Sequence, residues 1–297
     1  MISEAPMTVA CIVVLTLSLA GPSVQSPAQS PSLLSRRYED GARLAYRMNG
    51  ENDGSTYAIR LHSVVKKGTD GRFVEEYAWS DLVSDGQRRP LPATAESFRA
   101  TVTLAEGGAP FVPPDLSKTP GIVGPVLDLM TFYADLFLAI HAGALREVGD
   151  RLLFPAPAVG SWADGTRVLV GEDAVDFDIT LTGIDRPAGT ATLTVKHIPP
   201  KEAKIRLPAD WMRAPVTGTP NNWVQVVRSG EAYVASVGQE TFDVVLQIRL
   251  ADGVMLSASM ANPVIKIERQ CRDAELHQCD EARPGRTFRR IEMVLEP

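Results

Sequence analysis

The stretch Ala174–Ile184, AVDFDITLTGI, alternates apolar and polar side chains almost from end to end. Its apolar set is Val175, Phe177, Ile179 and Leu181, and its polar set is Asp176, Asp178, Thr180 and Thr182. A period of two is that of a β-strand with one covered face and one face in water. The stretch therefore predicts a strand in a sheet that is buried on one side only.

Outward from this stretch, the same period recurs along the chain. The further segments are TYAIRLHSVVKK (56–67), RFVEEYAWS (72–80), SFRATVTL (97–104), TATLTVKHI (190–198) and TFRRIEMVL (287–295). In the second of these, Glu75 falls on the same face as the aromatic side chains Tyr77 and Trp79. TFDVVLQIRL (241–250) and VMLSASM (254–260) are joined by Ala251–Gly253, a strong hairpin signal. The pattern predicts about ten to twelve strands in a mainly β protein.

One segment has a different period. Pro125–Gly143, PVLDLMTFYADLFLAIHAG, begins with proline and ends with glycine, as helices commonly do. Asp128, Thr131 and Asp135 share one narrow stripe, and nearly all the other side chains are apolar. Such a helix is expected to be buried on most sides.

Together these elements predict one large curled antiparallel sheet, a half-barrel or two packed β-layers, with the buried helix at about 125–143. An antiparallel sheet of this many strands curls or splits rather than staying flat. We expect one β-rich domain over 36–297, with a sub-division near 155–165 as the alternative.

This combination resembles the periplasmic lipoprotein-carrier type, an unclosed β-barrel with a helical plug. The resemblance rests on the long hairpins, the single helix LDLMTFYADLFLAI and the export signals described next, and it is one of element pattern rather than motif. It implies a hydrophobic or lipid-like ligand held between sheet and helix. A pair of β-domains sharing the helix also fits.

The N-terminus has the pattern of a secretory leader. Met7–Ala20, MTVACIVVLTLSLA, carries no charge and has the length of a signal-peptide core. Small residues follow as far as Ala28, so we expect a signal peptide at 1–28 and a Pro/Ser-rich spacer at 29–35. The n-region carries Glu4 and no Lys or Arg, which initiation at Met7 would explain. The alternative is a buried N-terminal helix or strand.

Removal of the leader would leave two cysteines, Cys271 and Cys279. In an exported chain an even count favours a disulfide, here closing a short loop. A zinc site that uses these two thiolates with His277 and Asp280 is the alternative, but the spacing matches none of the usual zinc patterns.

Composition excludes several classes of function. The 297 residues carry 30 Lys+Arg against 36 Asp+Glu, a net charge of −6, with no basic run. Nucleic acid is therefore not an expected partner. The apolar fraction of 44% is that of a globular protein. No transmembrane helix is expected in the mature chain, and no cofactor or metal is predicted.

Motifs for catalysis are either absent or in the wrong setting. Ser63 and Lys66 match the S-x-x-K spacing but fall on opposite faces of a predicted strand. The Asn49–Gly54 tract, NGENDG, lacks the glutamate that ends a calcium loop and reads as a turn. No serine-hydrolase elbow, zinc-protease helix or phosphate-binding loop occurs.

Two weaker sites remain as hypotheses. Asp176 and Asp178 share a strand face, with Asp173 close by, and could flank a sugar or a cation. His141 and Asp135 could form a polar pair facing a cavity. In each case the structural explanation, a solvated strand face or the end of a buried helix, is favoured.

The sequence thus favours an exported, non-enzymatic binding protein, periplasmic or extracellular. The candidate ligand-binding residues are those of the helix: Leu127, Met130, Phe132, Tyr133, Phe137, Ile140 and His141. The alternatives are an envelope structural or protein-interaction module and, less favoured, a hydrolase.

Overall fold

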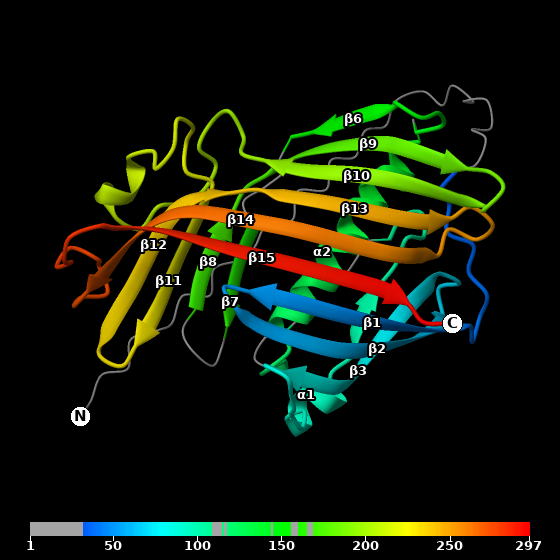
Figure 1. The fold of residues 1–297 in the computed structure, drawn as a ribbon, viewed down its shortest axis with the longest axis horizontal. Coiled ribbons are helices and arrows are strands. Elements are labelled where there is room, and N and C mark those ends of the chain that lie inside the picture. The colour runs from blue at the N-terminus through cyan, green and yellow to red at the C-terminus, as the bar shows by residue number, and fades with distance from the viewer. Residues whose placement is uncertain (1–31, 109–114, 116–117, 144, 156–159, 165–168) are drawn as a thin grey trace, which may run out of the picture. The chain divides into compact units, whose positions relative to one another are not determined.

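Alternating side chains build an open antiparallel sheet in the computed structural model (Figure 1). The structure describes residues 32–297 except 109–114, 116–117, 144, 156–159 and 165–168. The predicted leader at 1–28 and the first residues of the spacer lie outside this range. Every element described below belongs to the unit Pro31–Pro297.

The strands are more numerous than the sequence pattern indicated, because several short ones lack a readable period. The first eight are β1 (Arg43–Asn52), β2 (Ser55–Lys67), β3 (Phe73–Ser84), β4 (Gln87–Arg88), β5 (Ala100–Val102), β6 (Arg151–Phe154), β7 (Gly160–Asp164) and β8 (Leu169–Asp173). The others are β9 (Asp176–Asp185), β10 (Thr190–Ile198), β11 (Trp223–Ser229), β12 (Ala232–Glu240), β13 (Phe242–Arg249), β14 (Met255–Cys271) and β15 (Arg283–Leu295).

The sheet branches at β14, its longest strand. On one side β14 pairs with β15, and the order continues through β1, β2, β3 and β4. On the other side its first half pairs with β13, which leads to β10, β9 and β6, and its second half pairs with β12, which leads to β11, β8 and β7. All the pairs are antiparallel. Figure 1 shows β14 passing from the broad part of the sheet to the narrower β12–β11 part.

The predicted hairpin at Ala251–Gly253 is present between β13 and β14. Gly253 adopts a φ of +69°, and its Cα approaches the backbone of Ser35 and Arg36 so closely that a Cβ would collide with it. Asp252 accepts two hydrogen bonds from the Arg249 guanidinium, each of 2.9 Å. The glycine therefore serves both the turn and the docking of the segment before β1.

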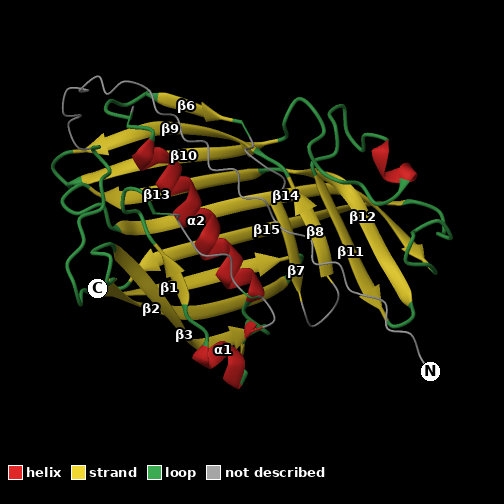
Figure 2. Ribbon diagram, turned by 180° about the vertical axis from the view of Figure 1, so that it is seen from behind, coloured by secondary structure: helices red, strands yellow, loops and turns green. Residues whose placement is uncertain are grey.

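The predicted helix is α2 (Val123–His141), two residues earlier than expected at both ends. Figure 2 shows it lying across one face of the sheet, which we call the inner face. It is the long helix of the described residues; the others are the short α1 (Ala93–Ser97) and the 3₁₀ helix η2 (Asp210–Arg213). By length and composition α2 could also cross a membrane, but most of it is buried within the fold. The fold class is as predicted: mainly β, open, with one apolar and mostly buried helix.

Two hydrophobic clusters stabilise the fold. The larger joins α2 to the inner face. It includes Leu34, which lies within the predicted spacer at 29–35 and is fully buried. The smaller lies under the β11–β12 part and contains Met212, Val237 and Leu276. The segment just before β1 is thus part of the main core.

Candidate functional site

The contact between α2 and the inner face is the candidate site, because it combines an apolar seam with buried ionisable groups. Leu129, Phe132 and Leu136 of α2 are fully buried against the sheet. The predicted ligand-binding residues divide between two sides of the helix. Met130, Phe132, Tyr133 and Ile140 are buried, Leu127 and Phe137 are half-buried, and His141 is exposed.

Asp128, near the start of α2, is the first of three polar links between helix and sheet. Its side chain is 1% exposed and forms an ion pair with Arg289 of β15. Tyr57 of β2 donates a hydrogen bond of 2.8 Å to the other carboxylate oxygen. Burial lowers the pKa of Arg289. The negative charge that the helix brings inward is therefore met by a cation and a hydroxyl from the sheet.

Tyr133 forms the second link, to a network centred on Glu75 of β3. The Tyr133 hydroxyl donates to Glu75 Oε2 at 2.6 Å, and the Tyr77 hydroxyl reaches the same oxygen at 3.1 Å. Arg36 Nε lies 3.0 Å from Glu75 Oε1. Burial raises the pKa of both tyrosines well above the usual value, so their hydroxyls remain donors. The position of Glu75 on an otherwise aromatic face was the sequence signal for this network.

Asp135 forms the third link, to His197 of β10. His197 Nε2 lies 2.7 Å from Asp135 Oδ1, and both side chains are at most 5% exposed. Phe177 and Phe242 pack their rings on either side of the imidazole, with centroids 4.7 and 4.8 Å away. Burial raises the pKa of Asp135 despite the histidine. Its Oδ2 is buried and has no hydrogen-bond partner among the described residues.

This pairing corrects the proposed His141–Asp135 pair. His141 instead stacks on Phe137, with ring centroids 4.0 Å apart, and its Nδ1 lies 3.0 Å from the Phe137 carbonyl oxygen. The reason is geometric: Asp135 lies on the flank of α2 that contacts β10, whereas His141 lies on the outward side. The true partner is 62 residues distant in sequence.

A second group of buried polar side chains lies where the sheet branches. Asn262 donates to Glu240 Oε1 at 3.0 Å, and Asn222 donates to the Glu240 carbonyl at 3.0 Å. Burial, with the nearby Asp173 charge added, raises the pKa of Glu240 to about 8. Burial also raises the pKa of Asp173 to about 6, against the opposing effect of His197. Because Asp173 interacts electrostatically with His197, and His197 pairs with Asp135, this branch cluster and the Asp135 link lie close enough to influence each other.

The hypothesis of a paired-carboxylate site loses one member to an ion pair. Asp178 receives two hydrogen bonds of 2.6 Å from Arg151, and these lower its pKa. Asp176 is also engaged rather than free. Over the residues that the structure describes, no group of three His, Cys, Asp or Glu side chains is arranged to hold a metal ion.

The S-x-x-K residues lie on opposite faces of β2, as predicted. Ser63 is buried, while Lys66 pairs with Glu76 on the outer face.

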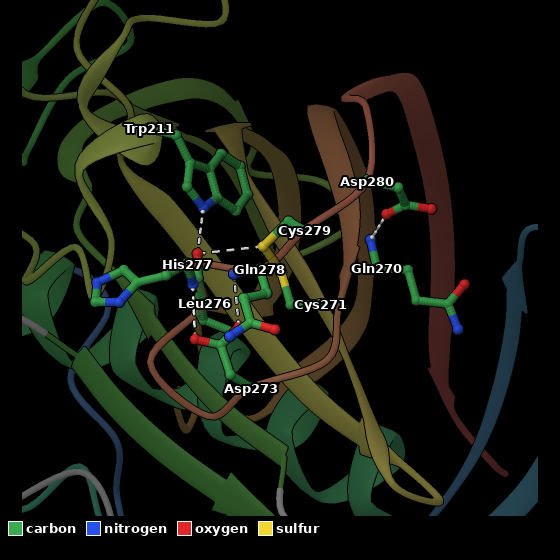
Figure 3. The surroundings of a disulfide bond; sticks show 9 residues. All are labelled: Trp211, Gln270, Cys271, Asp273, Leu276, His277, Gln278, Cys279 and Asp280. Atoms are coloured by element: carbon green, nitrogen blue, oxygen red, sulfur yellow. Dashed lines mark hydrogen bonds between the residues drawn. A yellow bond between two sulfur atoms is a disulfide. The ribbon is translucent and has the colours of Figure 1, made fainter.

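Cys271 and Cys279 form the predicted disulfide, with their sulfur atoms 1.99 Å apart (Figure 3). The loop between them is held by Asp273, which accepts hydrogen bonds from two backbone N–H groups, and by Trp211, whose indole donates to the Leu276 carbonyl at 3.2 Å. Figure 3 shows the imidazole of His277 pointing away from the sulfurs. The loop therefore packs against the smaller hydrophobic cluster, to which Cys271 and Leu276 belong.

The sequence matches no protein-family model and no curated protein.

Proposed function

We propose that the protein is an exported, non-enzymatic binding protein that holds a hydrophobic or lipid-like ligand between the sheet and α2. The observation that carries this proposal is the unusual polarity of α2. Its carboxylates, Asp128 and Asp135, are buried against the sheet, while its outward side carries half-buried apolar residues such as Leu127 and Leu138. A helix that only covered a core would carry its carboxylates on the side that faces water.

The polar links hold α2 in place without binding it as tightly as an apolar seam would. Removing two charges from water costs free energy that their attraction only partly restores, so buried ion pairs commonly stabilise less than apolar packing of equal volume. The three polar links, the Asp128 and Asp135 pairs and the Tyr133 hydrogen bond, define one docked position from which α2 can separate. We therefore assign α2 the role of a lid on the inner face.

The face under α2 suits an acyl chain. Its side chains come from β14 and from strands on both sides of it, and they are almost completely buried; they include Leu61, Leu193, Val195, Met260 and Ile291. Separation of α2 would expose this apolar surface, and a lipid-like ligand would replace the side chains of the helix. The leader at Met7–Ala20 and the disulfide are consistent with export, and the resemblance to the lipoprotein-carrier type points in the same direction.

The test uses two phenylalanines on opposite sides of α2. Phe132 is fully buried toward the sheet, whereas Phe137 is half-buried on the outward side. Delipidated protein is titrated with the apolar fluorescent probe N-phenyl-1-naphthylamine. Phe132→Leu, which opens space under the helix, should raise the affinity severalfold, and Phe137→Leu should leave it unchanged. Absence of probe binding, or a response to the Phe137 variant alone, would contradict the proposal.

An envelope interaction module is the second candidate, favoured by the edge strand β6. Leu153 on this strand is 63% exposed, and β6 pairs only with β9 among the described strands. An unpaired edge with an apolar side chain is a place where another chain can add. Crosslinking in the native envelope that recovers one partner through β6, together with no retained lipid in native mass spectrometry, would favour this candidate.

A further inference from the structure

A hollow of about 290 Å³ lies in the outer face of the sheet, on the side away from α2. Strands β1 to β4 form it, and its rim carries the three arginines Arg47, Arg60 and Arg88. Alternation in β1 places it outside: Met48 is fully buried, while Arg47 is exposed. The hollow is therefore separate from the contact between sheet and helix, and the inference drawn from it does not depend on the proposed function.

A small residue at the centre of a row of larger ones creates the hollow. Asn49, Ala58, Val83 and Arg88 lie opposite one another on successive strands. The small side chain of Ala58 leaves space above β2, and together Ala58 and Val83 form an apolar floor. Beside this row β3 carries one extra residue, because Ala58 pairs with Val83 and Arg60 pairs with Ser80. Asp81 lies in this bulge and has a φ of +55°. The floor and its wall are thus set by the backbone of β2 and β3.

Arg60 is held at the wall of the hollow by a pair with Glu296. Its Nε and Nη2 lie 2.9 and 3.1 Å from the two carboxylate oxygens of Glu296, and its Nη1 lies 3.7 Å from Asp81. This bidentate pairing holds the guanidinium in a fixed plane. Arg60 therefore contributes a rigid positive wall.

Arg47 and Arg88 are the arginines with donors to spare. Arg47 has one contact, 3.6 Å to Glu296, and Arg88 has one, 3.3 Å to Asp81. A guanidinium has five N–H donors, so most of them face water at the rim. Their strands are separated by three inter-strand spacings, roughly 14 Å, so two extended side chains can approach one ligand over the floor. The residues that line the hollow include three arginines and one carboxylate, Asp81, so the lining is positive in a protein of net charge −6.

We propose that this hollow binds a small organic anion, a carboxylate or phosphate group carried on a flat apolar body. The apolar body lies on Ala58 and Val83, and the anionic oxygens accept hydrogen bonds from Arg47 and Arg88. Arginine matches both oxyanions because its planar fork binds two oxygens at once. The volume suits a ligand of one ring, at the lower end of small-molecule sites.

The experiment titrates the full chain with phenyl phosphate and benzoate, and with two half-ligands, inorganic phosphate and benzamide. Binding is followed by chemical-shift changes of backbone amides. Both complete ligands should bind at least tenfold more tightly than either half-ligand, with the largest shifts in β2 and β3. Equal binding of inorganic phosphate and phenyl phosphate would overturn the role of the apolar floor, and equal binding of benzamide and benzoate would overturn that of the arginines.

Variants locate the site. Arg88→Gln should weaken phenyl phosphate binding at least tenfold, the size of one lost charge-assisted hydrogen bond pair. Arg213→Gln is the matched control, because Arg213 also forms a single exposed pair, 3.2 Å to Asp210. Ala58→Phe fills the floor and should abolish binding while α2 and the core are untouched. Unchanged binding in both the Arg88 and the Ala58 variants would refute the site.

Discussion

The protein should lose stability between pH 5 and pH 9, and replacing Glu240 by glutamine should abolish most of that loss. Burial raises the pKa of this carboxyl from 4.5 to about 8. A raised pKa means that the folded state favours the protonated acid. The stabilising contribution is therefore complete below pH 4.5 and is lost as the pH rises through about 8.

The magnitude follows from the two pKa values. At about 1.4 kcal/mol per pKa unit, the full difference is about 5 kcal/mol, of which about 4 kcal/mol falls between pH 5 and pH 9. Glutamine fits the site because its side-chain carbonyl can accept the hydrogen bond that Asn262 donates to Glu240. The variant thus keeps the geometry and removes the ionisation.

Other shifted groups do not mask this effect. The carboxyls with lowered pKa values, such as Asp178 and Glu268, change their contribution in acid, below the range tested. Asp173 and Asp135 have raised pKa values and act in the same direction as Glu240. The variant should therefore retain a smaller loss of stability with rising pH rather than none.

Urea unfolding followed by tryptophan fluorescence at pH 5, 7 and 9 measures the free energy of unfolding directly. The exposed Glu231 provides the matched control, since Glu231→Gln makes the same chemical change without burial. A loss between pH 5 and pH 9 that is the same in the Glu240 variant as in the wild type would refute the reasoning.

Two further predictions concern stability at neutral pH. Arg36→Met should lower the free energy of unfolding in a urea titration by about 3 kcal/mol, because Glu75 would keep its buried charge and lose its cation. The control Arg37→Met, at an exposed position, should leave this free energy nearly unchanged. Gly238→Ala should lower the melting temperature measured by circular dichroism and the free energy of unfolding by about 2 kcal/mol or more, because the new Cβ would collide with the β14 backbone. The control Gly218→Ala should leave the melting temperature nearly unchanged, because its Cβ would enter open space. A neutral result for either buried variant would contradict the packing described.

The local elements could be predicted from the sequence because their signals are local. Alternation identified β9 and β10, the Ala251–Gly253 turn identified the β13–β14 hairpin, and the proline and glycine at its ends identified α2. The disulfide followed from cysteine count and spacing. The branching of the sheet could not be predicted, because it depends on which strands pair with each half of β14, and a single strand pattern does not encode its partners.

For the candidate site, the sequence indicated the local features of α2 but not the residues that α2 contacts. The apolar residues of α2 stood out, and Glu75 was visible on an aromatic face. The stripe of Asp128 and Asp135 was also visible, but their partners were not. Arg289 and His197 lie 161 and 62 residues away, on strands that only the folded sheet brings beside the helix. Polar pairs across long separations leave no mark in a local pattern.

The three polar links have one consequence for α2 that apolar packing alone could not supply. An apolar helix on an apolar sheet gains nearly the same burial in several positions, because the hydrophobic effect is non-directional. Asp128 contacts β2 and β15, Tyr133 contacts β3, and Asp135 contacts β10. A shift of one helical turn would break all three links and leave charges buried without partners. The links therefore select one position for α2 on the inner face. The lid role that we propose for α2 requires this kind of specificity, because the helix would have to return to the same place on the sheet.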